Sequence, residues 1–396
     1  MAGEKKLKRE PFAYISKRDG VSLTYRITVR AAAIVLALVV CGIVTKVLTG
    51  DNPISIYQTI VHGAVGKGRL LVTIHDIAIL LCISLAVTPA FRMRFWNTGA
   101  EGQVLIGCLA TAACMFWLGG KVPNGVLILI MTVAAIVSGM IWGVIPAIFK
   151  AQWKTNETLF TLMMNYVAIQ LVEYFLKIAD KSGSNVVGPD LLSHGWLPDI
   201  FGVKYLLNII IVAVITVLMQ IYLKYSKHGY EISVVGESEN TARYIGINVK
   251  KVIIRTMLVS GAICGLAGLL LVGGSSHSID SNLVGGRGFT AIMVSWLGKF
   301  NPLIMIGTAL FVVVMQTGTG QINTDFSLGS TDFSNMIIGI VFFFVIGCEF
   351  FITYSIKAAG GWKEFTAKAG KIFKREKTAE TTQAAVKRRR NNVNCH

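Results

Sequence analysis

The sequence predicts an all-α polytopic integral membrane protein with about ten membrane segments and both termini in the cytoplasm. Of its 396 residues, 53% are hydrophobic and only 15% are charged, whereas a soluble domain carries about 25% charged residues. The mean hydropathy is +0.61, too high for a disordered chain. Apolar runs of about 20 residues, the length that crosses ~30 Å of hydrocarbon, recur along the sequence.

The apolar runs give the order of the expected segments. They lie at 31–49, 70–90, 98–119, 124–149, 157–177, 205–223, 253–273, 288–298, 303–317 and 334–356. The run 288–298 is too short to cross a bilayer alone, and Lys299-Phe300-Asn301-Pro302 separates it from the next run. We therefore expect it to be one half of a broken pair, because irregular backbone at membrane depth is tolerated when protein buries it.

The basic residues set the orientation. Eight Lys and Arg residues lie in 1–30 and eleven follow residue 356. With the N-terminus in the cytoplasm and every run crossing or returning, 30 of the 38 Lys and Arg residues face the cytoplasm, as the positive-inside rule requires. This distribution explains the net charge of +17 better than nucleic-acid binding does.

Three regions follow from this topology. Residues 1–30 form a basic cytoplasmic N-terminal segment, and residues 31–356 form the transmembrane domain, whose longest internal cytoplasmic loop is 224–252. Residues 357–396 form a basic, partly disordered cytoplasmic tail, which anionic lipid attracts at about 1 kcal/mol per basic residue. The main external loop is 178–204.

Motifs for nucleotide, metal or catalytic chemistry are absent from the sequence. It contains no GxxxxGK[ST] phosphate loop and no HExxH spacing, so this chain is not expected to hydrolyse ATP by itself. An intramembrane enzyme would need carboxylates, His or a nucleophile gathered at one depth, and the sequence shows no such group. We expect neither an enzyme nor a bound cofactor.

Glycines at helical spacing predict close helix packing. Gly139 and Gly143 form one GxxxG pair; Gly261 and Gly265 form another, with Gly268 one turn further on. Small faces of this kind let helix backbones approach closely.

Polar residues inside the apolar runs are candidates for function, because they are costly there. The third run opens with Asn97, Glu101 and Gln103, and the fifth opens with Glu157 and carries Asn165 about two turns deeper. We take these five residues as candidates for a polar translocation path or gate. The alternative is that Glu101 and Glu157 only stabilise the positive N-termini of their own helices.

The second run contains an isolated acid, Asp76, beside His75. A buried basic partner and a role toward the substrate are equally good explanations of this residue.

The loop 224–252 contains a helix-like stretch from Ser238 to Ile245, which Gly246 is placed to end. A short rigid helix between two spans suggests docking of a cytoplasmic partner. Taken alone, the same charges also fit an ordinary solvated loop.

Four ordered motifs resemble those of bacterial ABC importer permeases of the nucleoside type. Asn97-Thr98-Gly99-Ala100-Glu101-Gly102-Gln103 is similar to an N-x-G-A-E-G-Q signature, and Asn156-Glu157 with Thr161-Leu162-Met163-Met164-Asn165-Tyr166 to an N-E-x(4)-L-M-x-N-Y stretch. The cytoplasmic loop and the element Gly288-Phe289-Thr290-Ala291-Ile292, Leu297-Gly298 and Asn301-Pro302 resemble the other two. Together they cover roughly residues 70–350.

The resemblance implies a division of labour among subunits. Two permeases, here a heterodimer, form the pore in the bacterial plasma membrane, a lipoprotein or periplasmic binding protein delivers the nucleoside, and two cytoplasmic ATPases bind the ATP. It also assigns a coupling role to residues of the cytoplasmic loop. These are Gly229, Glu231, Gly236, Glu237, Asn240, Ala242, Arg243, Tyr244 and Gly246.

The sequence departs from the family pattern at two places, which leaves other cargoes open. His75-Asp76 stands where a small or apolar stretch is expected, and Glu237-Ser238-Glu239 is more acidic than the usual coupling segment. The same type of importer for a simple sugar or a branched-chain amino acid is the first alternative. An ATP-independent secondary transporter is the second, and it fits less well because Asp76 is the one deep isolated acid.

Overall fold

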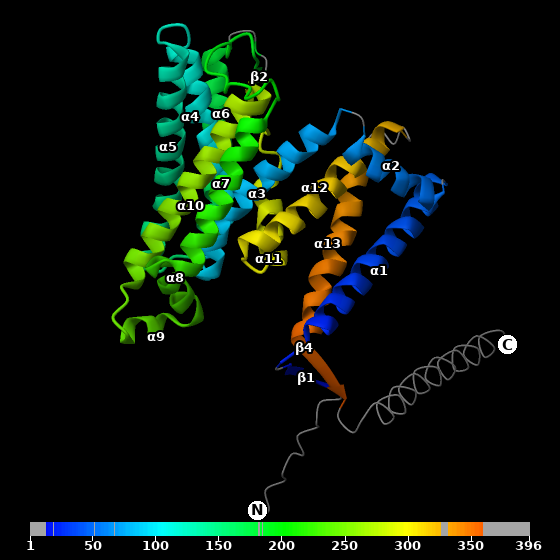
Figure 1. Cartoon of the computed structure of the whole chain (residues 1–396). Helices are drawn as coiled ribbons and strands as arrows, with labels where there is room; N and C mark the ends of the chain where they lie inside the picture. Colours follow the sequence, from blue (N-terminus) through cyan, green and yellow to red (C-terminus); the bar gives the residue numbers. More distant parts are fainter. Residues whose placement is uncertain are drawn as a thin grey trace, which may run out of the picture. The chain divides into compact units, whose positions relative to one another are not determined.

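The computed structural model describes residues 13–18, 20–50, 52–66, 68–180, 183, 185–325 and 332–358. The chain divides into two compact units: Met1–Val44 with Gly339–His396, and Thr45–Ile338. Figure 1 labels the elements of both. In chain order they are β1 (Ala13–Lys17), α1 (Leu23–Thr49), α2 (Pro53–Val65), α3 (Leu70–Arg92), α4 (Ala100–Leu118), α5 (Asn124–Trp153), α6 (Glu157–Ala179), β2 (Val186–Val187), α7 (Leu206–Tyr225), α8 (Lys227–Glu237), α9 (Glu239–Tyr244), α10 (Val249–Leu271), the π-helical turn η1 (Val272–Ser276), β3 (Ile279–Asp280), α11 (Arg287–Leu297), α12 (Pro302–Asp325), α13 (Asp332–Thr353) and β4 (Tyr354–Ala358).

The predicted all-α fold with a series of membrane-spanning helices is confirmed. In the part of the chain that the structure describes, nine helices are long and apolar enough to cross a membrane. The short run 288–298 forms α11, which has only 11 residues and is about 16 Å long. It is a half-helix, as the break at Lys299–Pro302 predicted. Helix α2 lies outside the ten predicted runs.

The first unit joins the two ends of the membrane domain. Strand β1 pairs with β4 in antiparallel register, Ala13 opposite Ala358 and Lys17 opposite Tyr354. The Arg30 guanidinium of α1 donates to the Glu349 carboxylate of α13 at 2.5 Å. These contacts hold the start of α1 and the end of α13 together, which agrees with two termini on the same side of the membrane.

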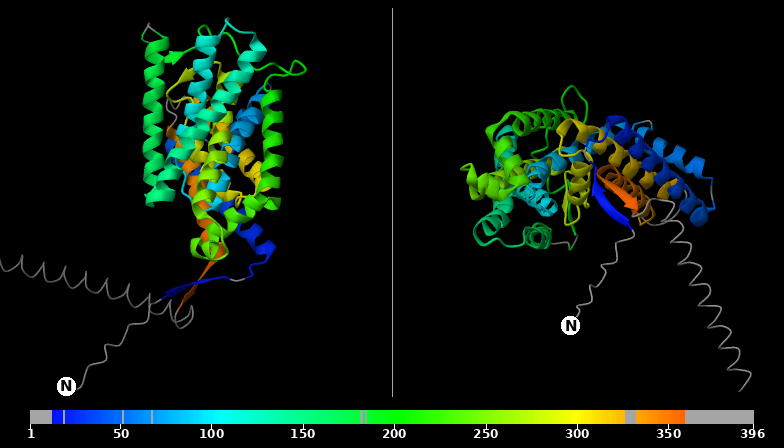
Figure 2. Two further views of the ribbon diagram at one scale, coloured as in Figure 1. Left: turned by 90° about the vertical axis from the view of Figure 1, so that its left-hand side faces the viewer. Right: turned by 90° about the horizontal axis from the view of Figure 1, so that it is seen from below.

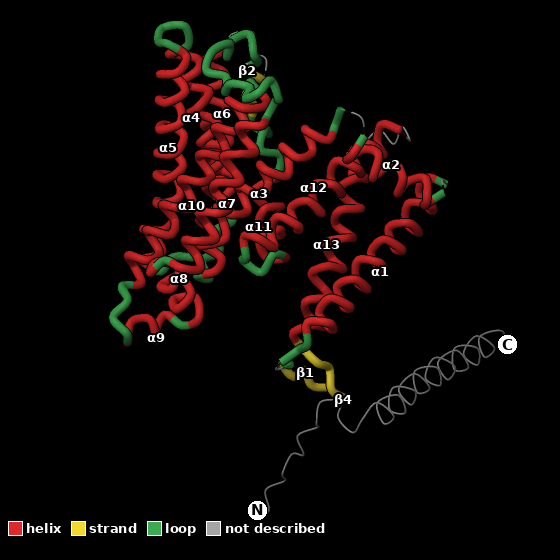
Figure 3. The backbone as a smooth tube through the Cα atoms, in the orientation of Figure 1, coloured by secondary structure: helices red, strands yellow, loops and turns green. Residues whose placement is uncertain are grey.

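The second unit is a helical bundle in which most of the long helices run side by side, with connections gathered at the two ends (Figure 2). One end carries the short helices α8 and α9, and the opposite end carries the loop with β2 (Figure 3). Strand β2 pairs with β3 across that loop, Val187 opposite Ile279.

Glycines bring α5 and α10 together at the centre of the second unit, as their spacing predicted. A Cβ atom built on Gly139 would lie 2.8 Å from the Cα of Gly265, and one built on Gly261 would lie 3.0 Å from the Cα of Met140. Helix α4 joins the same seam, where a Cβ on Gly107 would lie 2.7 Å from the Cα of Gly265. Because a side chain has no room at these positions, the backbones of three helices pack in direct contact.

Candidate functional site

Two serines divide the loop 224–252, which the sequence predicts to be cytoplasmic, into two short helices. The Ser226 hydroxyl accepts a hydrogen bond from the backbone N–H of Gly229 at 3.0 Å, which caps α8. The Ser238 hydroxyl accepts one from Thr241 N–H at 3.2 Å, which caps α9. Ser238 has an extended backbone between the helices, and Gly246, at φ +84°, follows the end of α9. We call α8 and α9 the platform.

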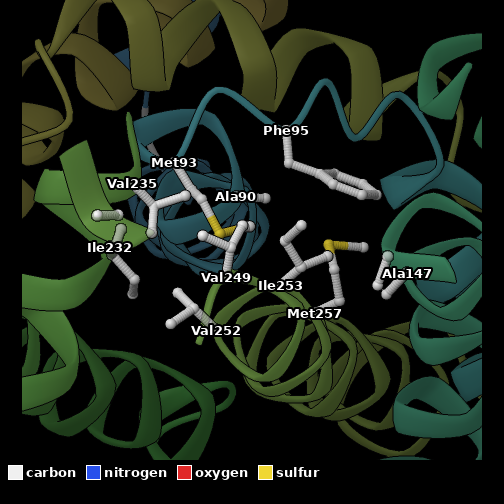
Figure 4. Packing of buried hydrophobic residues seen from close by; sticks show 12 residues of the cluster. Ala90, Met93, Phe95, Ala147, Ile232, Val235, Val249, Val252, Ile253 and Met257 are labelled. Carbon is white, nitrogen blue, oxygen red and sulfur yellow. The ribbon is translucent and has the colours of Figure 1, made fainter. Parts of the chain in front are cut away.

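The platform is fixed to the membrane helices by a hydrophobic cluster (Figure 4). Ile232, Val235 and Ala242 of the platform are 1%, 4% and 0% exposed. They pack with residues at or next to the ends of α3, α5 and α10 that lie beside the platform: Ala90, Met93, Phe95, Ala147, Ala151, Val249, Val252, Ile253 and Met257. A close-packed core has low compressibility and transmits strain, so these contacts connect the platform directly to the three helix ends.

The outer edge of the platform presents apolar and aromatic surface. Tyr244 is 91% exposed and Ile245 is 55% exposed. Arg243 and Glu239, one turn apart on α9, form an exposed ion pair at 3.4 Å. A rigid protrusion that ends in an exposed tyrosine is suited to insertion into a partner's groove.

The nine predicted coupling residues fall into two groups. Glu237, Asn240, Arg243, Tyr244 and Gly246 are exposed. The others hold the platform in place: Ala242 is in the cluster, and Glu231 forms an ion pair with Arg255 of α10 at 2.6 Å. A Cβ on Gly229 would meet Leu223 of α7, and a Cβ on Gly236 would lie 3.3 Å from the Cα of Met93.

A group of polar residues lies where α11 begins, beside α3 (Figure 1). The Glu101 carboxylate, in the first turn of α4, accepts hydrogen bonds from the backbone N–H groups of Gly286 at 2.8 Å and Gly288 at 2.7 Å. An anion at this position satisfies two free N–H groups and stabilises the positive end of the helix dipole. Glu101 therefore stabilises the N-terminus of a different helix, an arrangement that its place in the sequence did not indicate.

A glycine is required for this contact. A Cβ on Gly288 would lie 2.7 Å from the Cα of Glu101, so a larger residue would push α11 away from α4.

Asp76 has a basic partner at the same place. Its carboxylate pairs with the Arg287 guanidinium at 3.4 Å, and the side chains are 24% and 33% exposed. The His75 Nε2 lies 3.1 Å from the Asn208 Nδ2 of α7, which also donates to the Leu270 carbonyl oxygen of α10. The ion pair with Arg287 gives Asp76 the basic partner that was one of its two proposed explanations. Sequence reasoning missed Arg287 and Asn208, because neither stands in an unusual pattern.

The remaining motif residues of the third and fifth runs join α4 to α6 and α10. Asn165 of α6 accepts from Gly102 N–H at 2.9 Å and donates to the Thr98 carbonyl oxygen at 3.0 Å. The Asn97 side chain caps the turn before α4 by accepting from Gly99 N–H at 3.1 Å, and it contacts Gln103. These side chains provide hydrogen-bond partners for backbone groups in the turn between α3 and α4 and in the first turn of α4.

Glu157 is also paired. Its carboxylate accepts from the Lys150 ammonium of α5 at 2.7 Å. All five residues expected on a translocation path thus have protein partners in this chain, and their contact with cargo stays a prediction.

A family model described as "Branched-chain amino acid transport system / permease component" matches residues 70–346, which include both the platform and the polar group at the start of α11. The chain belongs to this permease family. With its nine candidate spans among the described residues, the permease is a multi-pass protein of the cell membrane.

The permease is similar to proteins named for different cargoes. It is 29% identical over 323 residues to a guanosine ABC transporter permease protein of Bacillus subtilis (strain 168), covering 79% of this chain and 91% of the relative. It is 26% identical over 341 residues to a glucose ABC transporter permease protein of Haloferax volcanii, covering 82% and 88%. A nucleoside ABC transporter permease protein of Lactococcus lactis subsp. cremoris (strain MG1363) is 25% identical over 318 residues, with 76% and 86% covered.

Proposed function

We propose that this permease is the membrane subunit of an ATP-binding cassette importer that carries nucleosides into a bacterial cell by alternating access. The observation that carries the proposal is the platform, which is rigidly packed on its inner side and presents Tyr244 on its outer side. The sequence lacks a phosphate loop, so separate ATPase subunits bind the ATP. The permease itself binds no cofactor and catalyses no reaction.

The packing contacts of the platform would transmit its displacement to the membrane-spanning helices. Closure of the ATPases would displace Tyr244 and Ile245, and the hydrophobic cluster would pass that displacement to the ends of α3, α5 and α10. Helix α3 also carries Asp76, which pairs with Arg287 at the start of α11. Movement of α3 would therefore reach the half-helix α11, which we propose acts as part of the gate.

Nucleosides are the favoured cargo because two of the similar proteins carry guanosine or nucleoside in their names, and the sequence motifs resemble the nucleoside type. A sugar is the second candidate, because the relative from Haloferax volcanii is named for glucose. In both cases the cargo is a small polar solute that needs a wet path, for which Asn97, Glu101, Gln103, Glu157 and Asn165 are the proposed lining.

The complete importer would contain two ATPases, a second permease and an extracellular binding protein. We propose a heterodimer of permeases, because the long basic segment 1–30 resembles that of the longer member of such pairs. The binding protein would deliver the solute to the end of the bundle that carries β2.

Uptake of radiolabelled solutes tests the cargo. Cells with and without this permease, each expressing the partner subunits, would be given guanosine, adenosine, uridine, ribose, glucose or leucine. Nucleoside uptake that is lost only without the permease is the expected result. Loss of glucose, ribose or leucine uptake instead would support an importer but assign it a different cargo. No loss of uptake for any solute would contradict the proposal.

A further inference from the structure

The short helix α2 carries a polar stripe along one face. The stripe consists of Ser55, Gln58, Thr59 and His62, which recur at spacings of three and four residues and so share one side of the helix. In the structure these four side chains line a cavity of about 500 Å³. Two residues from other segments also line it: Arg69, just before α3, and Gln321, near the end of α12.

The other two faces of α2 are apolar. One packs on α12, which lies beside α2 (Figure 1): Ile60 is buried, and a Cβ atom built on Gly318 would lie 2.8 Å from the Cα of Ile60. The second face carries Ile54, Val61 and Val65, which are 66%, 60% and 55% exposed, as on a surface that contacts lipid. The close packing of α2 on α12 fixes the polar stripe beside the end of α12.

The chemistry of the cavity is that of hydrogen bonding. Hydroxyl, amide and neutral imidazole groups, which make up the polar stripe, can each donate and accept. The Arg69 guanidinium donates to the Gln321 amide oxygen across the cavity wall. Among the lining residues that the structure describes, none is acidic and none has an apolar side chain. This set matches a ligand with several hydroxyl groups, because a hydroxyl also donates and accepts.

The cavity lies at the end of α12 away from the platform. Pro302, the first residue of α12, lines a different cavity together with Gly229 and Tyr230 of α8. Gln321 is about five helical turns, or about 28 Å, further along α12. ATPases docked on the platform would therefore lie at one end of the second unit, and the polar cavity lies toward the other, where a binding protein would deliver solute.

We propose that this cavity is an entry site that binds the sugar hydroxyls of the cargo. The inference rests on the proposed function, and it narrows the cargo to solutes that carry a sugar ring. Guanosine and glucose, which stand in the names of two similar permeases, both carry such a ring, whereas leucine does not. The cavity volume lies within the range of about 300–1,000 Å³ that is typical of small-molecule sites.

Uptake into proteoliposomes that hold the complete importer tests the inference. The solutes are radiolabelled guanosine and its dideoxy analogue without the two ribose ring hydroxyls, and the ratio of their initial uptake rates is measured. Because the same binding protein delivers both solutes, its own preference cancels when a variant is compared with the wild type.

The test variant Gln58→Leu/Thr59→Val removes two hydrogen-bonding groups of the polar stripe at nearly constant volume. Each hydrogen bond lost is worth about fivefold, or about 1 kcal/mol. The preference for guanosine over the dideoxy analogue should therefore fall about 5- to 25-fold. Gln58 is exposed and Thr59 is partly exposed, so the variant should fold, which the amount of copurified ATPase checks.

Two further variants are the controls. Thr59→Ser keeps the hydroxyl and should keep the wild-type ratio. Ser193→Ala removes an exposed hydroxyl from the loop 178–204 and should change neither the rates nor the ratio.

Two results in the test variant would overturn the inference: wild-type rates for both solutes, or an equal loss of both rates at an unchanged ratio, which would assign the stripe a structural role. In either case ATP-dependent guanosine uptake by the wild type would leave the proposed function standing. Absence of guanosine uptake by the wild-type importer would instead refute the proposed function, and this inference with it.

Discussion

At the scale of single residues, the permease depends on charged and polar side chains that satisfy helix ends inside the bundle. Glu101 accepts from two backbone N–H groups at the start of α11, and Asn165 accepts from one near the start of α4. Such groups have no water partners at membrane depth, so each unsatisfied one costs several kcal/mol. The motif residues are therefore needed for structure whether or not they also touch cargo.

Replacing Glu101 by Gln should destabilise the permease. The amide keeps one acceptor oxygen but removes the charge that stabilises the α11 N-terminus, so we expect a loss of about 2 kcal/mol in the free energy of unfolding. Unfolding in mixed detergent measures this loss. The exposed Glu237→Gln variant is the matched control and should change stability by less than about 0.5 kcal/mol. Equal stability of the two variants would refute the capping role of Glu101.

The Asp76–Arg287 pair should show direct coupling in a double-mutant cycle. Asp76→Asn, Arg287→Gln and the double variant would be compared by the same unfolding measurement. Each single variant should lower the free energy of unfolding. For a partly buried pair we expect the sum of the two single losses to exceed the loss in the double variant by about 1 kcal/mol, which is the interaction energy. Strictly additive effects would mean that the two side chains do not interact.

At the scale of elements, packing of backbone against backbone holds α5 on α10. Gly139→Ala would place a methyl group 2.8 Å from the Cα of Gly265, and such overpacking costs about 1–3 kcal/mol. Gly307→Ala in α12 meets no atom within 4 Å and should stabilise its helix by up to about 1 kcal/mol. Thermal unfolding should therefore move in opposite directions for the two variants, and a shared direction would contradict this packing.

The platform is the element that should recruit the ATPase subunits. Tyr244→Ala removes a 91% exposed side chain, so the permease should fold normally. The amount of ATPase that copurifies with it should fall at least tenfold, which corresponds to about 1.4 kcal/mol of binding free energy. Quantitative gel analysis of the purified complex measures the ratio.

Tyr174→Ala is the control for this measurement, because Tyr174 is 66% exposed and lies toward the far end of α6. It should leave the ATPase content unchanged. If Tyr244→Ala retained the full complement of ATPase, docking through the tip of α9 would be wrong.

At the scale of the whole molecule, the sequence predicted the helices whose positions depend on hydropathy and on residues that break or cap a helix. The long apolar runs, the half-helix before Lys299–Pro302 and the helix near Ser238–Ile245 all follow from composition, from a Pro break or from a cap. The GxxxG spacing also identified the residues of the α5–α10 seam.

The sequence could not predict pairings between distant segments. Arg287 is separated from Asp76 by 211 positions, and β1 pairs with a strand at the other end of the membrane domain. Helix α2 was missed because its 13 residues mix apolar and polar side chains and are too few to cross a bilayer. The first two residues of the predicted tail, 357 and 358, belong to β4, and the expected disorder of the remainder, 359–396, lies outside the described residues.

We expect this permease to move solute only when partner ATPases hydrolyse ATP. The most direct test measures guanosine uptake into proteoliposomes that hold the permease and its partner subunits, with either ATP or a non-hydrolysable analogue on the ATPase side. We expect guanosine uptake with ATP and none with the analogue, and loss of uptake in the Tyr244→Ala variant. Equal uptake with ATP, with the analogue and without nucleotide would show a transporter that needs no ATPase, and would contradict the proposed ATP-driven import.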